Sequence, residues 1–522
     1  MYNNVPKSIK RIINLHSKGE IRRQSKGGLP FIGLDKFIKN SIKEVSDSAK
    51  IYEKYSFSGN LQIEGLNKPK HKKIRLGGGS PGSFPPYKNM IKNMHSLLDN
   101  FDFSYYPLAA GREEDRLKVI EYLSTLGIKN DKPYKDSKII DNGLSINNVI
   151  FTSSSTQAFT FILESIIDFN DVILITAPNY GLFLFNPERL GARIELIDLT
   201  CEDNWILDPV LFEKKIIQIN NNLLQDYKEN PNKYLLRKSR RPPKVIAFLN
   251  MNPHNPTGRV YGKSRMDILL DISSICLKNG IFIIDDLIYR ELSFNRDEKA
   301  IPISSINNMF SNVITLFGIS KAFSLSGFRA GMVIADEIII SLIRDKIFQS
   351  TDSISVLQSC AVSSVFNKKV NDIEKYTRKV STEYFFRYLL VKTLVEGIDS
   401  INSQYRNNIY NFFLKYKNKS YHDLLYGIDN VSIVKDMEPE SGFFVILDFT
   451  KLLYKSYSGF KIKDDESFLK FLYTFGNIKL LTGKAFCWPN ERELVGRVTY
   501  ALDPKDIIES FKELKSCISL LQ

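Results

Sequence analysis

The sequence has few residues that bind metals or form disulfides, with only five cysteines and five histidines among 522 residues. The histidines do not cluster, and the cysteines show no spacing typical of metal ligands. We therefore expect no metal site. An odd number of scattered cysteines also favours reduced, structural thiols in a cytoplasmic protein. The cysteines are Cys201, Cys276, Cys360, Cys487 and Cys517.

Long apolar runs are also missing. No stretch is long enough to cross a bilayer, so we expect no membrane partner. The charged, apolar and small-residue pattern of a secretory signal is absent as well. Residues 1–28 are basic and contain a single acid, Glu20. They fit either an organelle transit sequence or the N-terminal arm of a cytosolic enzyme, and we favour the arm.

The charge is unbalanced, with 72 lysines and arginines against 58 acids and a net charge of +14. Such an excess would suit a nucleic-acid partner if it were concentrated on one element. Here it is spread along the chain. The densest basic run, residues 237–241, falls in what we expect to be an inserted loop over residues 220–243. We therefore expect no nucleic-acid partner.

The chain is too long for one compact core, so at least two packed domains are expected. Between residues 148 and 335, apolar strand-like runs alternate with helix-like stretches. This alternation predicts an α/β fold with a largely parallel sheet covered on both faces. The expected strands are residues 149–153, 172–177, 194–199, 245–249, 281–284, 313–317 and 332–335.

The domain organisation follows from this pattern. We expect a large domain over residues 76–355 that carries the sheet, and a smaller C-terminal domain over residues 356–522. Residues 1–75 are expected to form an arm that contributes to the small domain or to a subunit interface.

The most informative stretch is residues 318–331, Gly-Ile-Ser-Lys-Ala-Phe-Ser-Leu-Ser-Gly-Phe-Arg-Ala-Gly. Lys321 offers an amine that can form an imine with an aldehyde, because a lysine loses its proton when it is desolvated or lies near other cations. Eight residues later, the planar guanidinium of Arg329 can hold a phosphate. Pyridoxal 5′-phosphate needs both groups. In a lysine-rich chain this stretch alone is only suggestive.

Two upstream motifs strengthen this interpretation. In Asn-Pro-His-Asn-Pro-Thr-Gly, residues 252–258, the two Asn-Pro steps stiffen the loop so that Asn255 can aim its amide at a fixed point. A plain turn is the alternative. The apolar run 281–284 ends in two acids, of which one could pair with a protonated pyridine nitrogen. Asp286 is favoured by its three-residue spacing to Tyr289, which could reach the ring oxygen, and Asp285 is the alternative.

Further motif residues follow other expected strands. Ser154, Ser155 and Thr156 begin a helix whose free backbone N–H groups could bind phosphate, although an ordinary N-cap would look the same. Tyr180 could stack on an aromatic cofactor or simply pack in the core. All these residues lie at or after the carboxyl ends of expected strands, where open α/β sheets bind ligands.

Together these motifs resemble the class I/II aminotransferases, the fold-type I enzymes that use pyridoxal 5′-phosphate, over about residues 75–515. The resemblance implies a large α/β domain with a mostly parallel sheet between helices, plus a smaller α+β domain. It implies that Lys321 is the Schiff-base lysine, that Asp286 faces the pyridine nitrogen, and that Asn255 and Tyr289 bind the ring oxygen. The other implied cofactor-binding residues are Ser154, Ser155, Thr156, Tyr180, Ser320 and Arg329.

The resemblance extends to the substrate and to a second subunit. Tyr106, five residues before Gly111, is similar to a family tyrosine that reaches the neighbouring subunit's phosphate, which implies a homodimer. Gly78 and Gly79 resemble the substrate-side loop. Arg497 resembles the arginine that binds the substrate α-carboxylate, with Asn255 close to it. A surface arginine on a strand is the alternative for Arg497.

The chain departs from the family pattern at three places. Gly318 stands where the family usually has serine, so one phosphate hydrogen bond is missing or comes from elsewhere. Ser154 stands where glycine is common. Thr482-Gly483 replaces the usual Pro-Gly ahead of Phe486. None of these changes removes an essential catalytic group.

The expected activity is transfer of an amino group between an amino acid and a 2-oxo acid. The same cofactor residues would also serve β- or γ-elimination or replacement, decarboxylation or a cyclising synthase, including in specialised biosynthesis, because fold does not determine reaction. A more remote alternative is a transcription regulator with an aminotransferase-like domain. Residues 19–30 faintly suggest its DNA-binding unit, but residues 31–75 show no clean recognition helix.

Overall fold

The computed structural model describes residues 74–82, 84–181, 183, 187, 190–235, 241–415 and 419–522. The expected N-terminal arm and the remote DNA-binding unit therefore lie outside the described residues, except for the last two positions of the arm. Among the described helices, none combines the length and the apolar character that crossing a bilayer requires.

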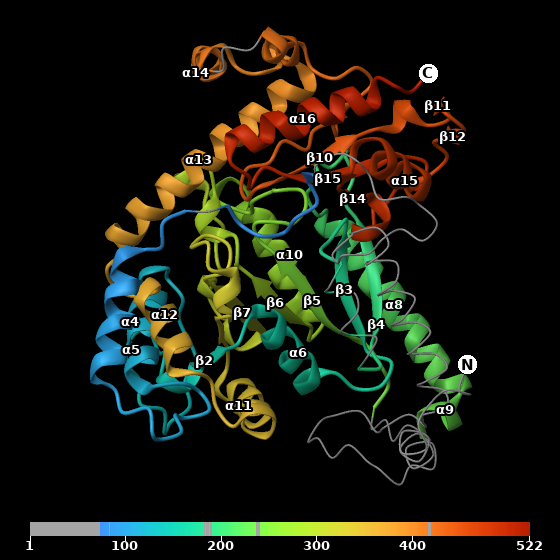
Figure 1. The fold of residues 1–522 in the computed structure, drawn as a ribbon. Helices are drawn as coiled ribbons and strands as arrows, with labels where there is room; N and C mark the ends of the chain where they lie inside the picture. Colours follow the sequence, from blue (N-terminus) through green and yellow to red (C-terminus); the bar gives the residue numbers. More distant parts are fainter. Residues whose placement is uncertain are drawn as a thin grey trace, which may run out of the picture.

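A seven-stranded sheet forms the centre of the molecule (Figure 1). Its strand order is β2-β8-β7-β6-β5-β3-β4. All neighbouring pairs from β7 to β4 are parallel, whereas β8 runs antiparallel to both β2 and β7. The strands are β2 (Val149–Thr152), β3 (Val172–Ala177), β4 (Arg193–Asp198), β5 (Val245–Met251), β6 (Phe282–Asp286), β7 (Val313–Gly318) and β8 (Gly331–Ile334). Each lies within two residues of an expected strand, and the expected fold class is confirmed.

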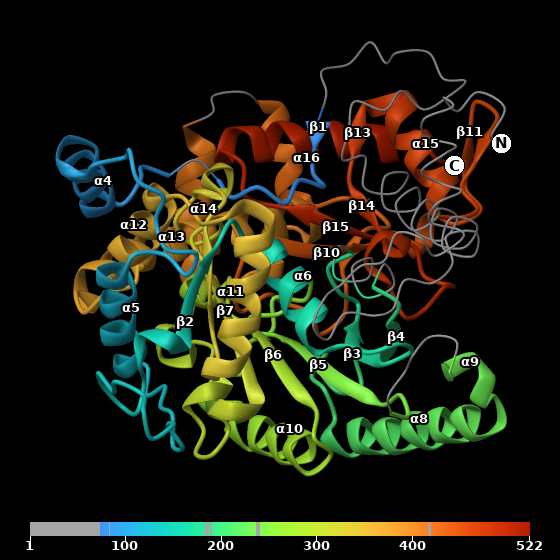
Figure 2. The ribbon, with the colours of Figure 1, turned by 90° about the horizontal axis from the view of Figure 1, so that it is seen from below.

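Helices cover both faces of this sheet (Figure 2). On one face lie α6 (Ser155–Ile166) and α11 (Glu337–Thr351), and on the other lie α8 (Pro209–Glu229) and α10 (Met266–Lys278). Successive strand residues enter different cores, as Ile283 and Ile284 do, because side chains alternate across a strand. Burial on both faces explains why these strands are continuously apolar.

A smaller antiparallel sheet of order β14-β15-β10-β9 lies in the C-terminal part of the chain. Its strands are β9 (Ser432–Ile433), β10 (Phe444–Asp448), β14 (Leu481–Thr482) and β15 (Val495–Thr499). The helices α13 (Val370–Glu396) and α16 (Pro504–Ile518) run above it in Figure 1. The two sheets fall on either side of residue 355 in the sequence. We keep the division into residues 76–355 and 356–522 as a proposal.

The remaining elements complete the chain. The short strand β1 (Ile74–Arg75) pairs with β13 (Ile478–Lys479), so the first described residues lie against the C-terminal part. The others are α4 (Lys88–Asn100), α5 (Glu113–Thr125), α9 (Pro231–Leu235), α12 (Val356–Val365), α14 (Ser403–Leu414), α15 (Asp465–Gly476), β11 (Ser456–Tyr457) and β12 (Phe460–Lys461).

The expectation of a loop beginning at residue 220 is wrong. Helix α8 continues to Glu229, and α9 follows directly after it. The reason is the helical spacing of apolar residues, because Ile216, Ile219 and Leu223 share one buried face of α8. Residues 236–240 of the expected loop lie outside the described residues.

The buried carboxylate of Glu291 lies in the segment between β6 and β7, which a network of ion pairs links to α13. Glu291 accepts a hydrogen bond from the Tyr122 hydroxyl at 3.1 Å and forms ion pairs with Arg290, Arg296 and Lys299. Burial alone would raise the pKa of Glu291, but the three cations lower it to about 2. Arg296 and Lys299 also pair with a second carboxylate, Glu374 on α13, at 2.6 and 2.5 Å.

We predict that Glu291→Gln lowers the free energy of unfolding by about 3–5 kcal/mol, because it leaves the buried Arg290 without its counter-charge and leaves Arg296 and Lys299 with Glu374 alone. The pKa of Glu291 in the folded chain lies below the ordinary value of about 4.3. Its contribution is therefore present above that pH and is lost as the pH falls towards 2. Urea unfolding at several pH values measures both effects. The control Asp399→Asn disrupts an exposed pair with Arg406 and should cost less than about 1 kcal/mol; equal losses would contradict the prediction.

Candidate functional site

The topology brings the motif residues to one edge of the large sheet. The carboxyl ends of β2, β3, β5, β6 and β7 meet there, and β8 begins there because it runs the opposite way. In the register, Gly331 of β8 lies between Thr152 of β2 and Gly318 of β7. The loops that carry Ser154, Lys321 and Arg329 therefore leave the sheet side by side.

Lys321 lies just beyond the end of β7. Its Nζ donates a hydrogen bond to the carbonyl oxygen of Gly79 at 2.8 Å. The same nitrogen lies 5.9 Å from the centre of the Tyr289 ring. We call residues 76–82 the glycine-rich loop. The structure thus brings Lys321 and Tyr289 together with this loop, as the resemblance implies.

The electrostatic surroundings favour a neutral amine on Lys321. Burial lowers its pKa, and the positive charges of Arg497 and Arg329 lower it further, to about 8. Asp286 acts in the opposite direction and raises it. An appreciable fraction of the amine is therefore unprotonated near neutral pH, which nucleophilic attack and proton removal both require.

The two acids at the end of β6 point to opposite faces of the sheet. Asp286 is buried, which raises its pKa to about 6 although a backbone N–H and Lys321 lower it. Asp285 instead accepts hydrogen bonds from the Asn250 amide at 2.7 Å and the Ile303 N–H at 2.9 Å. The structure therefore places Asp286, and not the alternative Asp285, in the electrostatic environment of Lys321.

Arg497 is buried on β15 and reaches the same region from the smaller sheet. Its guanidinium donates to the Asn255 side-chain oxygen at 3.1 Å and to the Gly77 carbonyl at 3.2 Å. It also lies 4.0 Å from the centre of the Phe444 ring, a cation–π arrangement. Burial raises the pKa of Tyr289 while Arg497 lowers it, so the phenol also lies within reach of this charge.

The N-terminus of α6 has free hydrogen-bond donors. The Ser154 hydroxyl caps the helix by accepting from the Gln157 N–H at 3.2 Å. Within the described part of the chain, the backbone N–H groups of Ser155 and Thr156 have no acceptor. A side chain at position 331 would be crowded, because a Cβ there would lie 3.2 Å from the Ser155 nitrogen.

Ser154 itself has an unusual backbone, with φ 153° and ψ 162°. Glycine adopts this conformation far more readily than other residues. This gives a physical reason why glycine is common at this place in the family. The serine is accommodated here through its role as the helix cap.

The other cofactor candidates lie around the same edge. Arg329 is exposed, has a left-handed φ of 56° and donates to the Ser326 carbonyl at 2.9 Å. Ser320 is buried next to Lys321. Tyr180, which follows β3, influences the pKa of Tyr289 and so lies near it. At Gly318 an added Cβ would make only ordinary contacts, so lack of space does not explain the missing serine.

Not every expected residue meets Lys321 within this chain. The side chain of Tyr106 is 85% exposed and lies in a groove that none of Lys321, Arg329 or Arg497 lines. Gly79 contacts Lys321, whereas Gly78 is exposed and has open space around the position of a Cβ.

Several residues that shape the site carry no sequence signal. Gly82, at the end of the glycine-rich loop, donates its N–H to the Tyr384 hydroxyl at 2.7 Å and accepts at its carbonyl from the Ser324 hydroxyl at 2.9 Å. Tyr384 lies in the middle of α13, far away in sequence. Phe444, whose ring lies against the Arg497 guanidinium, carries no motif that marks it as a site residue.

His254 could have been found within its motif. Burial lowers its pKa to about 3, so the ring is neutral. Its two nitrogens lie 3.0 Å from the hydroxyl oxygens of Thr176 and Thr257. These contacts link the loop that carries Asn255 to β3, which fixes the direction of the Asn255 side chain.

We predict opposite shifts of the Lys321 pKa in two variants. Asp286→Asn removes a charge that raises this pKa, so it should fall below about 8, and Arg497→Gln removes a charge that lowers it, so it should rise. The folded pKa lies below the ordinary value of about 10.4, so the reactive fraction grows as the pH rises through it. The rate of Lys321 modification by an amine-reactive reagent, followed by mass spectrometry against pH, measures the shift. Arg378→Gln, at an exposed position, is the control; identical profiles in all variants would contradict the prediction.

The chain is similar to known proteins over most of its length. Nicotianamine aminotransferase 1 of Oryza sativa subsp. japonica is 22% identical over 455 residues, which cover 85% of this chain and 74% of that protein. Aspartate aminotransferase of Bacillus sp. (strain YM-2) is 21% identical over 441 residues, covering 84% and 90%. The crystal structure of aspartate aminotransferase from Rhizobium meliloti superposes with a TM-score of 0.65 at 16% identity, covering 92% of this chain and 96% of that one.

The structural likeness establishes the fold, and the match to the family carries the classification. The family Aminotransferase class I and II matches residues 140–511, which include every motif from Ser154 to Arg497. The chain belongs to the class I and II aminotransferases.

Proposed function

We propose that this protein transfers an amino group from an amino acid to a 2-oxo acid, with pyridoxal 5′-phosphate as its cofactor. The observation that carries the proposal is the setting of Lys321. Its amine has a lowered pKa and lies at one sheet edge with a buried acid and two arginines. The cofactor requires an amine for its aldehyde, an acid for its ring nitrogen and a cation for its phosphate. An amino acid requires a second cation for its carboxylate.

The residues present fit the cofactor. The unused N–H groups of Ser155 and Thr156 lie at the positive end of α6, and Arg329 comes from the same edge, so a phosphate would find three sources of donors. Asp286, with a pKa of about 6, is mostly ionised at neutral pH and can hold a protonated ring nitrogen. The remaining roles are as the resemblance implies: Asn255 and Tyr289 bind the ring oxygen, Tyr180 stacks on the ring, and Ser320 is a further cofactor-binding residue.

When bound, the cofactor supplies an aldehyde that captures amines and a ring that takes up negative charge from the substrate Cα. Lys321 would hold this aldehyde through its amine. When the substrate amine takes its place there, the freed neutral Nζ would be positioned to move the proton on the substrate Cα. Arg497 would orient the substrate by binding its α-carboxylate. The carboxylate would then accept the hydrogen bond that the guanidinium donates to the Gly77 carbonyl in this structure.

The glycine-rich loop bears directly on this step. Gly77 and Gly79 offer their carbonyl oxygens to Arg497 and Lys321, the two groups that the substrate and the cofactor need. Binding therefore exchanges loop contacts for ligand contacts. Gly78 and Gly79 have open space at their Cβ positions, so these two residues can shift without displacing a packed core, whereas Gly77 is held against the backbone of Leu480.

We also propose a homodimer in which Tyr106 reaches the cofactor phosphate of the partner subunit. The exposure of Tyr106 supports this, as does that of its apolar neighbours Phe103, Tyr105 and Leu108. A cytoplasmic location is proposed from the cysteines, which are all free thiols.

Replacing Lys321 with alanine tests the proposed reaction. We expect Lys321→Ala to lower the rate of transamination by at least about 10³-fold, because the variant loses both the aldehyde-binding amine and the general base. Formation of 2-oxo acid from a panel of amino acids, with 2-oxoglutarate as acceptor, measures the loss. Release of ammonia or carbon dioxide in the same assay would reveal one of the other cofactor-dependent outcomes.

The control for this experiment is Lys278→Ala, at an exposed lysine paired with Glu213 on the opposite side of the sheet. It should retain full activity. A Lys321→Ala enzyme with the wild-type rate would show that the proposed role of this lysine is wrong.

Mixing two inactive variants tests the dimer. Tyr106→Ala should weaken cofactor binding if Tyr106 serves the partner's site. Subunits of Tyr106→Ala and Lys321→Ala, mixed after mild dissociation, should regain activity, because each mixed dimer contains one site with both native residues. Activity assays and size-exclusion chromatography follow the exchange. A mixture that stays inactive while mixed dimers form would contradict the shared site.

A further inference from the structure

The glycine-rich loop is held at both ends and loosely surrounded in the middle. At its start, the Leu76 N–H donates to the Lys479 carbonyl at 2.8 Å. At its end, Gly82 is buried and hydrogen-bonded through both its N–H and its carbonyl. Between these ends, a Cβ at Gly78 or Gly79 would meet open space. The position of the middle of the loop therefore depends on how its two ends are held.

The end of the loop lies along the turn that carries Lys321, and two hydrogen bonds join the two segments. The Lys321 Nζ donates to the Gly79 carbonyl at 2.8 Å, and the Ser324 hydroxyl donates to the Gly82 carbonyl at 2.9 Å. Both pairs are 242 residues apart in the sequence, so the loop and the turn run side by side with one constant offset. The bond from Ser324 thus helps to set where the Gly79 carbonyl meets the amine.

Tyr384, in the middle of α13, holds the N–H side of Gly82. Its buried hydroxyl accepts a hydrogen bond from this N–H at 2.7 Å. A Cβ at position 82 would lie 2.8 Å from Nη1 of Arg387, so a side chain there would displace this guanidinium. Arg387 in turn pairs with Glu383 at 2.9 Å and lies 5.8 Å from the centre of the Tyr384 ring. Gly82 therefore occupies a close-fitting position between Ser324 and Tyr384.

The Tyr384 ring belongs to a packed group of aromatic rings that reaches the site. Its centre lies 5.3 Å from that of Phe443, which lies 5.7 Å from Tyr289 and 4.6 Å from Phe444. The Phe444 ring lies against the Arg497 guanidinium. Since neighbouring rings restrict one another in a close-packed interior, the Tyr384 hydroxyl has a fixed position relative to the residues of the site.

The loop contributes to the burial of Lys321 through the contact with Gly79. Burial is the largest of the effects that bring the pKa of Lys321 to about 8, while Arg497 and Arg329 lower it further and Asp286 raises it. A loop that left its position would admit water to the amine. It would do so without removing any of these three charges.

We propose that Tyr384 and Ser324 are positioning residues, which hold Gly82 in place and thereby keep the glycine-rich loop over Lys321. Tyr384 comes from α13 and Ser324 from the segment between β7 and β8, so the end of the loop is held from both parts of the chain. The inference rests on the proposed function for the reaction that Lys321 performs. The holding of the loop can be measured without that reaction.

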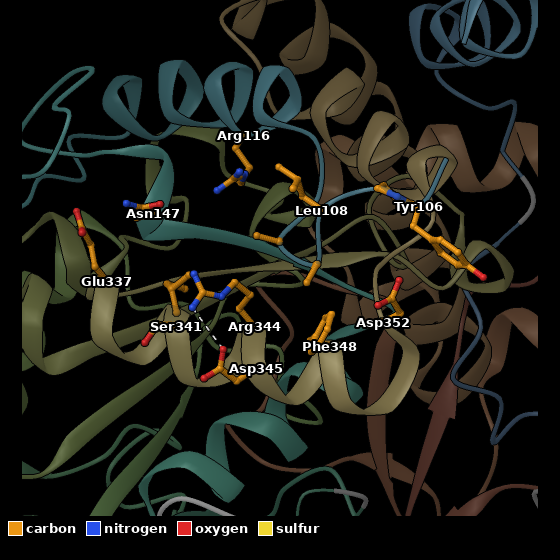
Figure 3. A pocket seen from close by; sticks show the side chains of 14 residues that line it. Tyr106, Leu108, Arg116, Asn147, Glu337, Ser341, Arg344, Asp345, Phe348 and Asp352 are labelled. Carbon is orange, nitrogen blue, oxygen red and sulfur yellow. Dashed lines mark hydrogen bonds and ion pairs between the residues drawn. The ribbon is translucent and has the colours of Figure 1, made fainter. Parts of the chain in front are cut away.

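The two positioning residues lie apart from the surface through which Tyr106 is proposed to reach a second subunit. The groove that contains Tyr106 is lined by residues 106–110 and by helices α5 and α11 (Figure 3). The glycine-rich loop, Ser324 and Tyr384 do not line it. A change at either positioning residue therefore leaves that groove intact.

The test measures how Lys321 reacts with an amine-reactive reagent in the full-length, cofactor-free protein, followed by mass spectrometry against pH. Tyr384→Phe and Ser324→Ala each remove one hydroxyl that holds Gly82. In both, the midpoint of the profile should rise from about 8 towards the ordinary value of about 10.4, because the amine becomes less buried. The rate at high pH, where the amine is neutral, should rise about fivefold, as the loss of one hydrogen bond predicts.

Two matched variants serve as controls. Tyr376→Phe removes a phenol of the same helix that donates to the Pro85 carbonyl at 3.0 Å, and Ser305→Ala removes a hydroxyl that donates to the Pro302 carbonyl at 2.7 Å. Both bonds lie outside the loop, so both profiles should match the wild type. If Ser324→Ala fails to fold, Ser324→Gly replaces it, because glycine suits the left-handed φ of 56° at this position.

Three outcomes would overturn the proposal. The first is a midpoint that stays or falls in Tyr384→Phe and Ser324→Ala. The second is an unchanged rate at high pH in both variants. The third is an equal change in Tyr376→Phe, which would indicate a general loosening of α13, and urea unfolding of each variant shows whether stability changes in parallel. Since no transfer of an amino group is measured, each of these results is distinct from a failed transamination assay.

Discussion

The reversed direction of one strand, β8, is the constraint on which the site depends. Because β8 runs antiparallel between β2 and β7, it starts at the edge where its neighbours end. This arrangement brings together the start of α6, which follows β2, with Lys321 after β7 and Arg329 before β8. The close approach also favours Gly331, since a Cβ there would press against the start of α6 and against the Phe317 carbonyl oxygen, 3.0 Å away. A parallel β8 would carry Arg329 to the opposite edge.

Charge at this edge serves two purposes at once. Under the proposed function Arg329 and Arg497 would bind anionic groups of a cofactor and a substrate, and the same two charges lower the pKa of Lys321. The cations that select anions therefore also prepare the amine to react. Asp286 limits this effect, and its own burial keeps its pKa near 6. Burial, adjusted by the charges of Arg497, Asp286 and Arg329, sets the protonation state of the lysine.

The large sheet could be predicted from the sequence because burial on both faces makes each strand a continuous apolar run. Asp286 could be distinguished from Asp285 by its spacing to Tyr289, and the alternation of side chains across β6 agrees. Other features depend on contacts between distant segments, such as Tyr384 holding Gly82 from α13. Arg116 looks like any residue of a charged helix, and only the tertiary packing shows that it is buried. The cofactor and substrate roles of the site residues stay predictions.

The pairing of β1 with the C-terminal part has a mechanical consequence. The Leu76 N–H donates to the Lys479 carbonyl at 2.8 Å, and its carbonyl accepts from the Thr499 N–H at 2.7 Å. Arg497 lies two residues away from Thr499 on the same strand. A rotation of the smaller sheet relative to the larger one would therefore move residues 76–79, which contact Lys321, together with Arg497. Access to Lys321 and binding of a substrate by Arg497 would then depend on the same hinge movement.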